Sequence, residues 1–590
     1  MSTAKKLLSG SGASADKINV EDDFNTHMYL GTGSSTQRYI AGGATIDLLN
    51  EGGLVWIKRR NGSHEHGLYD TARGTGKRLS TDSETAEETD NNGLSAFQAT
   101  GFTVVSADDC NGSGDTYVSW AFRKAPKFFD IVTYTGNGAS SHSIAHSLES
   151  MPGFIVIKRR DSTGGWHAIA RYSDENYMGG GASNSFGLDN KAIANNGVSP
   201  ANRGITATHF DVAKTYGGVG SFDVSKTNTN NATYVAYLWA HNDGDGDYGP
   251  SGDLDIIKCG SFTTDGSGSA LVGPNLGWEP QWVMFKNAGS TQSGDWWIMD
   301  SHRGFYSIGY TSDLGKTRFL RSNVTNEESN FTGNTLNLTS TGFTIPSDAF
   351  SPGQFFIYMA IRRAPTKEAE SGTEVFGINA GGSTNYFTAG SVNYMGVSPD
   401  DLVIVKRRDS TTPADQQWAV TDRIRGIEPW TSWATTSTTT TPTLFTHSTN
   451  GETVTGSRAG KYPGTNNLGG GNASSTNILA TNLAPGISYW WRRSPKFFDI
   501  ISYAGNGSAS QTLTHNLQGA PKMVWGKRRD GLSEGAGSNW LVYYGISGRG
   551  MFLNSDTNYT GITFVRQTGT TADAITSTTG FDVMLHSGGN

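Results

Sequence analysis

Four aspartates in one glycine-rich loop are the residues best suited to chemistry: Asp243, Asp245, Asp247 and Asp253. Alternating carboxylates on a flexible backbone can surround a calcium ion with oxygen ligands. An EF-hand loop, however, has Gly after its third acid and Glu at its twelfth position, where this loop has Tyr248 and Leu254. The pattern therefore predicts either a calcium site or a solvated connection between two domains. We expect no other cofactor.

Histidines and cysteines give weaker indications. His64 and His66 are two residues apart in a polar loop, whereas a metalloprotease helix spaces its histidines four apart. Cys110 and Cys259, the two cysteines of the chain, are far apart in the sequence and suit neither a disulfide framework nor a zinc site. We expect these cysteines to be buried or free thiols.

Carbohydrate is the remaining candidate ligand. A glycan-cleaving enzyme needs two carboxylates about 5–9.5 Å apart, but the acids that recur in strand-like phrases, Asp130 and Asp499, look like framework. Aromatic side chains in loops could instead stack on sugar rings, and the candidates are Trp430, Trp433, Tyr172 and Tyr177. We therefore predict no enzymatic activity and, at most, glycan binding by these aromatics.

The elements that position these residues are repeated. One strand-like phrase occurs five times, as LVWIKRR at 54–60, FIVIKRR at 154–160, WVMFKNA at 282–288, LVIVKRR at 402–408 and MVWGKRR at 523–529. Its spacing of roughly 100–130 residues is the size of one β-sandwich. We interpret Lys-Arg-Arg as a strand end whose basic stems cover apolar surface while their charged heads meet water. A glycan or phosphate site is the alternative.

Further phrases accompany most of the Lys-Arg-Arg phrases. A tryptophan follows in the later four copies, at Trp166, Trp296, Trp418 and Trp540, and we expect these rings to be core anchors. Three copies contain Asp-x-x-Arg-Gly, beginning at Asp70, Asp300 and Asp422, and these aspartates could pair with Lys-Arg-Arg. Gly-Phe or Ser-Phe turns stand at 101–102, 221–222, 342–343 and 580–581, and aromatic closing strands at 116–126, 233–241, 355–365 and 487–495.

These phrases predict an all-β chain of about five jelly-roll-like β-sandwiches in tandem. They are short, rich in β-branched and aromatic residues, and bounded by turn residues. Many are apolar at both parities, so we expect both faces of the strands to be covered. The expected segments are a docking tail at 1–19 and sandwiches at 20–125, 127–248, 249–365, 366–495 and 496–590. Proline at two of the junctions stiffens them, so the sandwiches should abut.

Composition excludes several classes of protein. With 77 Gly and only 17% charged residues the chain disfavours long helices, while 11% aromatic residues exclude general disorder. The formal net charge of −7 does not suit a nucleic-acid coat. No apolar run approaches the ~20 residues that span a bilayer, and the N-terminus lacks a signal-peptide core. We therefore expect no nucleic-acid partner and no membrane insertion.

The run YVAYLWAHNDGDGDYGPSGDLDIIKCGSFTTDGSG at 234–268, with APKFFDIVTYTGNG at 125–138 and the VIKRR phrase, resembles a repeated domain of tail-fibre-like and other virion proteins of marine tailed bacteriophages. The resemblance covers nearly all of the chain after about residue 25. It implies a jelly-roll-like β-sandwich and a structural or host-contacting role, and it carries no catalytic residues to this sequence.

The expected function is that of a virion structural protein, tail-fibre-like or tail-associated, which contributes to host attachment. The alternatives are a lectin-like adhesin that binds host glycan and a capsid decoration or head-fibre protein. The expected partners are other virion proteins, further copies of the chain and a host surface glycan or protein, and the expected location is the virion.

The fifth sandwich is expected to lack one strand. In the first unit the closing strand begins about fifteen residues after Phe102, whereas nine residues follow Phe581 in the fifth. An absent strand leaves unpaired backbone groups and an open apolar slot. We therefore expect this unit to be an assembly face.

Overall fold

A computed structural model shows a chain that is almost entirely β. It describes residues 19–39, 46–173, 176–179, 186–189, 195–198, 204–212, 224–249, 251–264, 273–289, 294–303, 317–330, 337–345, 350–364, 366–380, 401–407, 418–422, 442–445, 453–454, 486–503, 505, 508–528, 539–545, 550–553, 565–567 and 575–584. Strands make up 45% and helices 4% of these residues. The predicted all-β fold is confirmed.

Unit 1 is a sandwich of two antiparallel sheets. The main sheet has the order β1 (Phe24–Leu30), β9 (Thr116–Arg123), β3 (Gly53–Arg59) and β4 (Gly67–Asp70). The second sheet contains β2 (Thr36–Tyr39), β8 (Gly101–Val104) and β7 (Leu94–Gln98), and a small ribbon pairs β5 (Lys77–Arg78) with β6 (Glu88–Thr89). Two single-turn helices, α2 (Val20–Asp23) and α3 (Asp108–Asn111), complete the unit.

Unit 2 repeats this plan with a larger main sheet. Its order is β10 (Phe129–Thr135), β17 (Thr233–Ala240), β12 (Pro152–Arg159), β13 (His167–Ser173), β14 (Asn176–Gly179) and β15 (Asn195–Val198). Opposite it, β11 (Ser143–Ala145) pairs with β16 (His209–Asp211), and α5 (Val224–Thr227) follows. The Ser221-Phe222 turn lies outside the described residues, and His209–Asp211 provides the strand that Gly-Phe provides elsewhere.

Unit 3 has the same strand order. Its main sheet contains β18 (Ile257–Thr263), β25 (Phe355–Arg362), β19 (Pro280–Asn287), β20 (Trp296–Asp300), β21 (Arg318–Arg321) and β22 (Ser329–Asn330). A two-stranded sheet of β23 (Asn337–Thr339) and β24 (Gly342–Thr344) accompanies it.

Units 4 and 5 have fewer described residues. In unit 4, the main sheet contains β26 (Phe376–Ala380), β31 (Gly486–Trp491), β27 (Leu402–Arg407), β28 (Ala419–Asp422), β29 (Pro442–Phe445) and β30 (Thr453–Val454), preceded by the 3-10 turn η3 (Gly372–Glu374). Unit 5 contains two three-stranded sheets. They are β32 (Ser510–Thr514), β37 (Gly580–Met584) and β36 (Val565–Arg566), and β33 (Val524–Gly526), β34 (Leu541–Tyr543) and β35 (Gly550–Phe552).

In each main sheet of units 1 to 4 the closing strand (β9, β17, β25 or β31) lies between two others. On one side is the first strand of the unit's main sheet, here called the opening strand (β1, β10, β18 or β26), and on the other is the Lys-Arg-Arg strand (β3, β12, β19 or β27). In units 1 and 3, the apolar residues at alternate positions of the closing strand belong to two different cores. In unit 1, Tyr117 and Ala121 belong to the core between the two sheets of the same sandwich. Val118, Trp120 and Phe122 belong to a second core that contains residues of units 2 and 3. The predicted burial of both strand faces therefore holds for this strand, and the second face is covered by neighbouring units.

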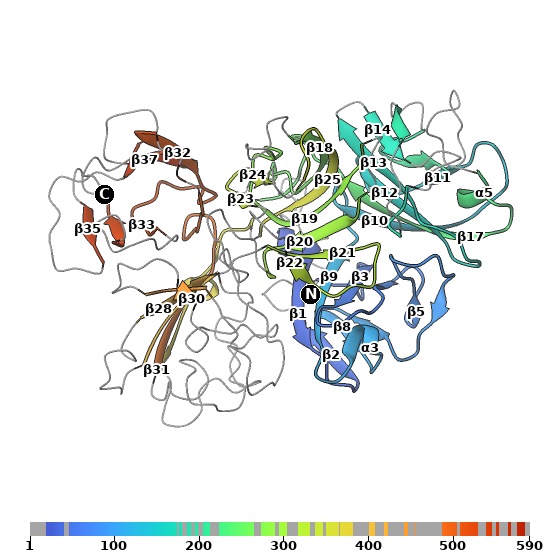
Figure 1. The fold of residues 1–590 in the computed structure, drawn as a ribbon, viewed down its shortest axis with the longest axis horizontal. Coiled ribbons are helices and arrows are strands. Elements are labelled where there is room, and N and C mark those ends of the chain that lie inside the picture. The colour runs from blue at the N-terminus through green and yellow to red at the C-terminus, as the bar shows by residue number, and fades with distance from the viewer. Residues whose placement is uncertain are drawn as a thin grey trace, which may run out of the picture.

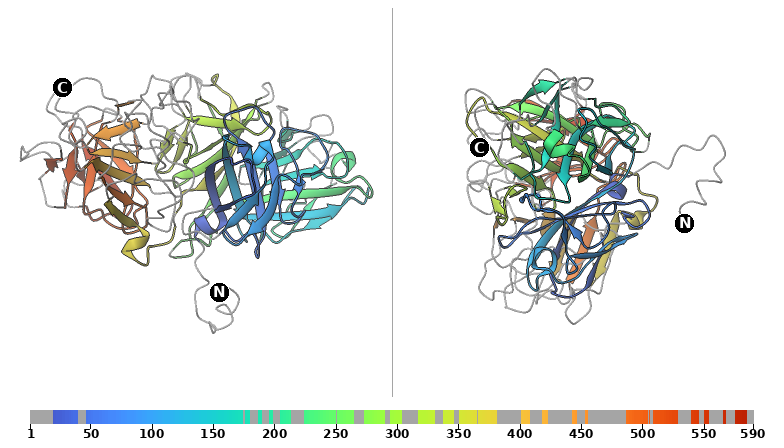
Figure 2. Two further views of the ribbon diagram at one scale, coloured as in Figure 1. Left: turned by 90° about the horizontal axis from the view of Figure 1, so that it is seen from below. Right: turned by 90° about the vertical axis from the view of Figure 1, so that its right-hand side faces the viewer.

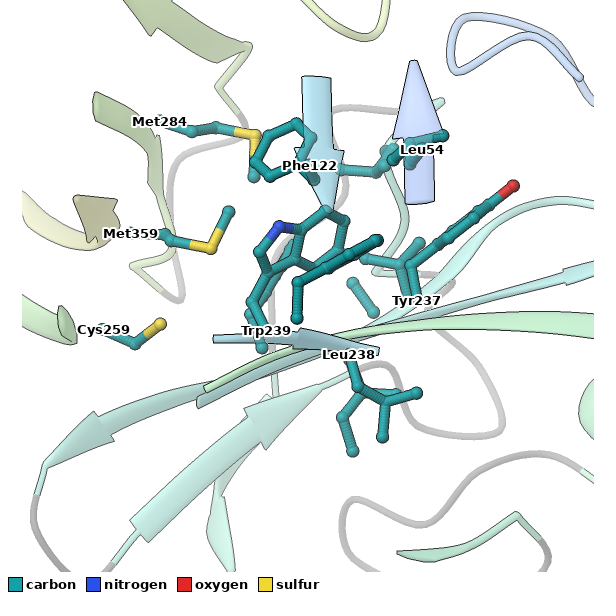
Figure 3. Packing of buried hydrophobic residues seen from close by; sticks show 14 of the residues in the cluster. Leu54, Phe122, Tyr237, Leu238, Trp239, Cys259, Met284 and Met359 are labelled. Carbon is teal, nitrogen blue, oxygen red and sulfur yellow. The ribbon is translucent and has the colours of Figure 1, made fainter. Parts of the chain in front are cut away.

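This shared core joins three sandwiches (Figure 3). Phe122 of unit 1 has its ring centroid 5.7 Å from Trp239 of unit 2 and 6.0 Å from Trp282 of unit 3. Met284 and Met359 of unit 3 project toward Phe122 and Trp239 in the same view. All five residues are buried. Because burial of apolar surface is the dominant favourable term in association, units 1 to 3 form one body rather than separate modules.

The arrangement of the units follows from this core. The strands of units 1 to 3 gather on one side of the molecule, with units 4 and 5 beside them (Figure 1). The view from below shows the same two groups (Figure 2, left). In the described part of the chain, no helix is long and apolar enough to cross a bilayer.

Candidate functional site

The Lys-Arg-Arg phrase clamps neighbouring sandwiches together. The second arginine of unit 1, Arg60, donates to both oxygens of Glu328 in unit 3, with Nε–Oε2 at 2.8 Å and Nη2–Oε1 at 2.6 Å. In the same way Arg160 of unit 2 binds Glu87 of unit 1, at 2.8 and 3.2 Å. In both pairs the backbone N–H of the glutamate also donates to the carbonyl of the arginine, at 2.9 Å. The geometry shared by the two pairs is a bidentate clamp across a unit border.

The lysines of the phrase reach the same borders. Lys58 donates to the carbonyl of Thr325 in unit 3 at 2.9 Å, and Lys158 donates to the carbonyl of Glu84 in unit 1 at 2.8 Å. Burial lowers the pKa of each ammonium group to about 8, so both remain charged at neutral pH. In units 1 and 2 the Lys-Arg-Arg phrase therefore makes structural contacts between sandwiches. The expectation that its charged heads meet water is wrong for Lys58, Lys158 and Arg60, because these side chains are buried at the unit borders.

Buried aspartates add a second set of contacts between units. Asp70 accepts from Nε of Arg73 at 2.5 Å and from the hydroxyl of Tyr237 in unit 2 at 2.7 Å. Asp300 accepts from Arg303 Nε at 2.5 Å and, at 3.0 Å, from the indole N–H of Trp120 in unit 1. Pairing of Asp70 and Asp300 with Lys-Arg-Arg, one possibility from the sequence, is wrong, because each binds the arginine three residues onward.

The aromatic phrase makes a third set of contacts, and its direction is cyclic. Trp166 of unit 2 donates its indole N–H to the carbonyl of Ser80 in unit 1 at 2.8 Å. Trp296 of unit 3 donates to Gly187 in unit 2 at 2.8 Å. In unit 1, His66 takes this role and meets the carbonyl of Arg321 in unit 3 at 3.0 Å. Unit 2 thus contacts unit 1, unit 1 contacts unit 3, and unit 3 contacts unit 2.

His66 is a structural residue. Its Nδ1 accepts the indole N–H of Trp56 at 2.9 Å, so its Nε2 carries the proton that is donated to Arg321. Burial holds the pKa of His66 well below its usual value, and the charge of Lys58 acts in the same direction. His64 instead contacts Asp109 at 3.2 Å. The two histidines therefore have different partners.

Three arginines near the Arg60 clamp stabilise the charged form of the Glu328 carboxylate. Burial alone would raise the pKa of Glu328, but Arg60, Arg318 and Arg303 outweigh it and lower the pKa to about 2. The side chains of Arg60 and Glu328 are 2% and 4% exposed, whereas those of Arg160 and Glu87 are 23% and 11% exposed. The two clamps thus share geometry and differ in exposure to water.

Ionic contacts also connect units 3, 4 and 5. Glu279 of unit 3 binds Arg363 at 3.2 Å and Arg493 of unit 4 at 3.1 Å. Arg363 also reaches Asp499 of unit 5 at 2.7 Å. Asn19 is buried and accepts the backbone N–H of Thr366 at 2.9 Å. The last residue of the predicted tail is therefore part of the folded body, and residues 1–18 lie outside the described residues.

The acidic loop makes contacts within the protein. Asp247 binds Lys127 at 2.7 Å, and Asp245 accepts the backbone N–H of Asp243 at 3.1 Å. Asp255 accepts the N–H groups of Gly244 and Gly246. Among the residues that the structure describes, no three His, Cys, Asp or Glu side chains gather as a metal site. The calcium site at Asp243, Asp245, Asp247 and Asp253 stays a prediction.

Two of the four glycan candidates can be placed. Tyr177 is fully buried and donates its hydroxyl to the carbonyl of Pro152 at 2.6 Å, so it is a core residue without a ring face for sugar. Tyr172 is half-buried, with its ring centroid 5.9 Å from that of Phe355 in an edge contact. Trp430 and Trp433 lie outside the described residues.

The partners of the clamps were not found from the sequence. Glu87 and Glu328 each stand directly before a short strand, and each belongs to a Glu-Glu pair. The recurrence of a Glu-Glu pair at the start of a short strand is the sequence signal from which these partners could have been found. What the arrangement can do is hold three sandwiches in a fixed relation, because buried ion pairs and the shared core coincide at the unit borders.

One family model matches residues 20–365, which is more than half of the chain and coincides with the three units that share one core. Comparisons with curated proteins and with solved structures found no match. The chain belongs to the family described as domain of unknown function DUF7483.

Proposed function

We propose that this chain is a non-enzymatic structural protein of a bacteriophage virion, tail-fibre-like or tail-associated, which contributes to host attachment. The observation that carries the proposal is the shared core of units 1 to 3 with its buried clamps. The repeated phrases are used for fixing one sandwich against another. A particle component needs this rigidity, because its domains must keep their positions while the particle meets a surface.

The resemblance of the repeated phrases to virion proteins supports the same proposal. One family model spans all three sandwiches, residues 20–365, which supports the view that they act as a single structural unit. The proposed partners are other virion proteins, with a host surface glycan or protein as the contact during attachment. The proposed location is the virion.

Labelling of intact particles tests the proposal. Particles are purified from a culture in which the gene for this chain is expressed by an infecting phage, and gold-labelled antibody against the full chain is located by electron microscopy. We expect labelling at the tail of the particle. Labelling at the head surface would assign the chain to capsid decoration instead, and its absence from purified particles by mass spectrometry would refute the proposal.

A glycan array separates attachment from a purely architectural role. The full chain is applied with and without calcium, and a denatured sample is the control. Binding of specific glycans by the native chain supports the attachment part of the proposal. No binding under either condition removes glycan recognition from it and leaves the structural part to the particle labelling.

A further inference from the structure

Units 4 and 5 are joined as units 1 and 2 are joined. Lys127 and Lys496 follow the junction prolines, and both have a positive φ, 58° and 62°. Their backbone N–H groups donate to the carbonyls of Leu148 and Leu517, at 2.6 and 2.5 Å. The chain therefore enters unit 5 with the same local geometry with which it enters unit 2.

The packing between the two sandwiches repeats as well. Trp540 of unit 5 lies in one apolar cluster with Ile404 of unit 4. The equivalent residues of units 2 and 1, Trp166 and Trp56, both belong to the shared core. Ile404 and Trp56 are the third residues of their Lys-Arg-Arg phrases. Units 4 and 5 thus have the contact of units 1 and 2, and among the described residues no third sandwich contributes to their cluster.

Unit 3 buries one strand of each neighbour in the shared core. The ring centroid of Trp282 in unit 3 is 6.1 Å from that of Phe24 in β1, the opening strand of unit 1. The ring centroid of Trp296 is 5.5 Å from that of Phe154 in β12, the Lys-Arg-Arg strand of unit 2. Phe24 and Phe154 are 0% and 2% exposed. A third sandwich therefore covers the opening strand of one neighbour and the Lys-Arg-Arg strand of the other.

The equivalent side chains in the Lys-Arg-Arg phrase of unit 5 are exposed to water. Met523 and Trp525 have the positions of Phe154 and Val156 in their phrases. They are 57% and 41% exposed, compared with 2% and 0% for the two residues of unit 2. Val524, between them, packs against the core of unit 5, as alternate side chains of a strand do. The exposed pair thus faces away from the core of its own sandwich.

The opening strand of unit 4 shows the same difference. Strands β26 and β1 both begin with phenylalanine, so Ile378 corresponds to Thr26. The pairing register agrees, because Ile378 pairs with Tyr489 and Thr26 pairs with Trp120, each three residues before the first arginine of its closing phrase. Ile378 is 55% exposed, whereas Thr26 is 2% exposed. The positions that unit 3 covers in units 1 and 2 are therefore exposed in units 4 and 5.

We propose that units 4 and 5 bind a second copy of this chain through the surface of Ile378, Met523 and Trp525, which we call the open face. These residues are three of the seven large apolar side chains that are exposed in the described part of the chain. Contact with a second copy would remove them from water, as unit 3 removes their counterparts. Burial of apolar surface of this kind drives protein association.

A second copy is the partner because it offers a matching surface. Its open face is apolar at the same three positions and brings no like charges together. The corresponding faces of its units 1 to 3 are already buried in the shared core, so within the described part of the chain the open face is the surface of this type that remains. Contact between identical faces is isologous and closes after two chains. This proposal does not depend on the virion role, because it rests on the equivalence of the units.

Analytical ultracentrifugation of the full chain tests the association. We expect the mass to rise with protein concentration from 63.0 kDa to twice that value, and no further. Amide hydrogen exchange is then measured on the monomer and on the dimer. Exchange at residues 376–380 and 523–526 should slow by about tenfold or more in the dimer, with little change in units 1 to 3.

Two variants place a charge on the open face. Ile378→Asp in unit 4 and Trp525→Asp in unit 5 should each weaken dimerisation by about tenfold or more, because the carboxylate would lose its water in the interface. Both side chains are exposed, so both variants should fold, and exchange at residues 486–491 and 541–543 checks this. Leu49→Asp changes another exposed apolar residue, 60% exposed in unit 1, and should dimerise normally.

Three results would overturn the proposal. The first is a chain that stays monomeric at every concentration, which would leave the open face to a different polypeptide. The second is a dimer that neither variant weakens, which would place the interface elsewhere. The third is strong protection of both segments in the monomer, which would show that the chain itself covers the open face.

Discussion

The clamp between Arg60 and Glu328 allows a quantitative test of the inter-unit contacts. Replacing Glu328 by Gln keeps the shape of the side chain and removes its charge, which leaves Arg60 buried without its counter-ion. The pKa of Glu328 falls from 4.5 to about 2 in the folded chain. At about 1.4 kcal/mol per pKa unit, this corresponds to about 3 kcal/mol of stabilisation of the carboxylate. Breaking a buried ion pair costs about 3–5 kcal/mol, which agrees with it.

Glu87→Gln is the matched control. It breaks the equivalent clamp to Arg160, whose side chain is 23% exposed, so water replaces part of the interaction. We expect a loss of about 1–2 kcal/mol there. Amide hydrogen exchange of the full chain measures the free energy of opening at each border. It is read at residues 54–60 and 321–330 for Glu328→Gln and at residues 84–89 and 154–160 for Glu87→Gln. Equal losses in both variants, or a loss below about 1 kcal/mol for Glu328→Gln, would refute the reasoning.

The pH dependence of stability tests the contribution of Glu328 in a second way. Because the pKa of Glu328 is lower in the folded than in the unfolded chain, the unfolded chain binds more protons between these two values, and stability falls as the pH falls. The contribution of Glu328 is complete above about pH 5 and is lost toward pH 2. The difference between the wild type and Glu328→Gln should therefore shrink over this interval. A difference that stays constant down to pH 2 would contradict the assigned pKa.

Three further predictions concern single side chains. Trp418→Ala should destabilise unit 4 by about 2–3 kcal/mol, less than the ~3–5 kcal/mol of a fully buried tryptophan because Trp418 is half-buried, and normal melting with lost cell adsorption would show that it is not a core residue. Tyr237→Phe removes a hydrogen bond to the buried carboxylate of Asp70 and should cost about 1.5–3 kcal/mol in an unfolding titration; unchanged exchange at the border of units 1 and 2 would count against it. Cys110 and Cys259 are buried, and burial raises the pKa of Cys259 to about 12, so thiol reagents should label both only on unfolding; rapid labelling of the native chain would be inconsistent with this structure.

Local patterns in the sequence predicted the strands but not what covers them. The apolar residues at both parities of the closing phrases correctly indicated burial of both faces. Nothing in the sequence indicates, however, that residues of units 2 and 3 bury the side chains of Val118, Trp120 and Phe122. That information depends on how whole sandwiches are placed, which no local period encodes.

The same limit applies to the ionic contacts. Asp70 binds Arg73, three residues away, because the turn brings their side chains together. Arg60 binds Glu328, which is 268 residues away, so its partner could not be found by spacing. The prediction of a glycan-binding role for Tyr177 fails for a different reason, because local composition suggested the wrong environment for its ring. Its place in a polar, turn-rich region favoured a loop, whereas strand β14 carries its ring into the core.

The central claim is that units 1 to 3 form one cooperative body through their shared core. Hydrogen exchange of the full chain, followed at increasing denaturant concentration, tests it at the three closing strands, residues 117–122, 234–239 and 356–361. We predict that all three strands lose protection together, at one denaturant concentration. Three separate transitions, one for each sandwich, would contradict the claim.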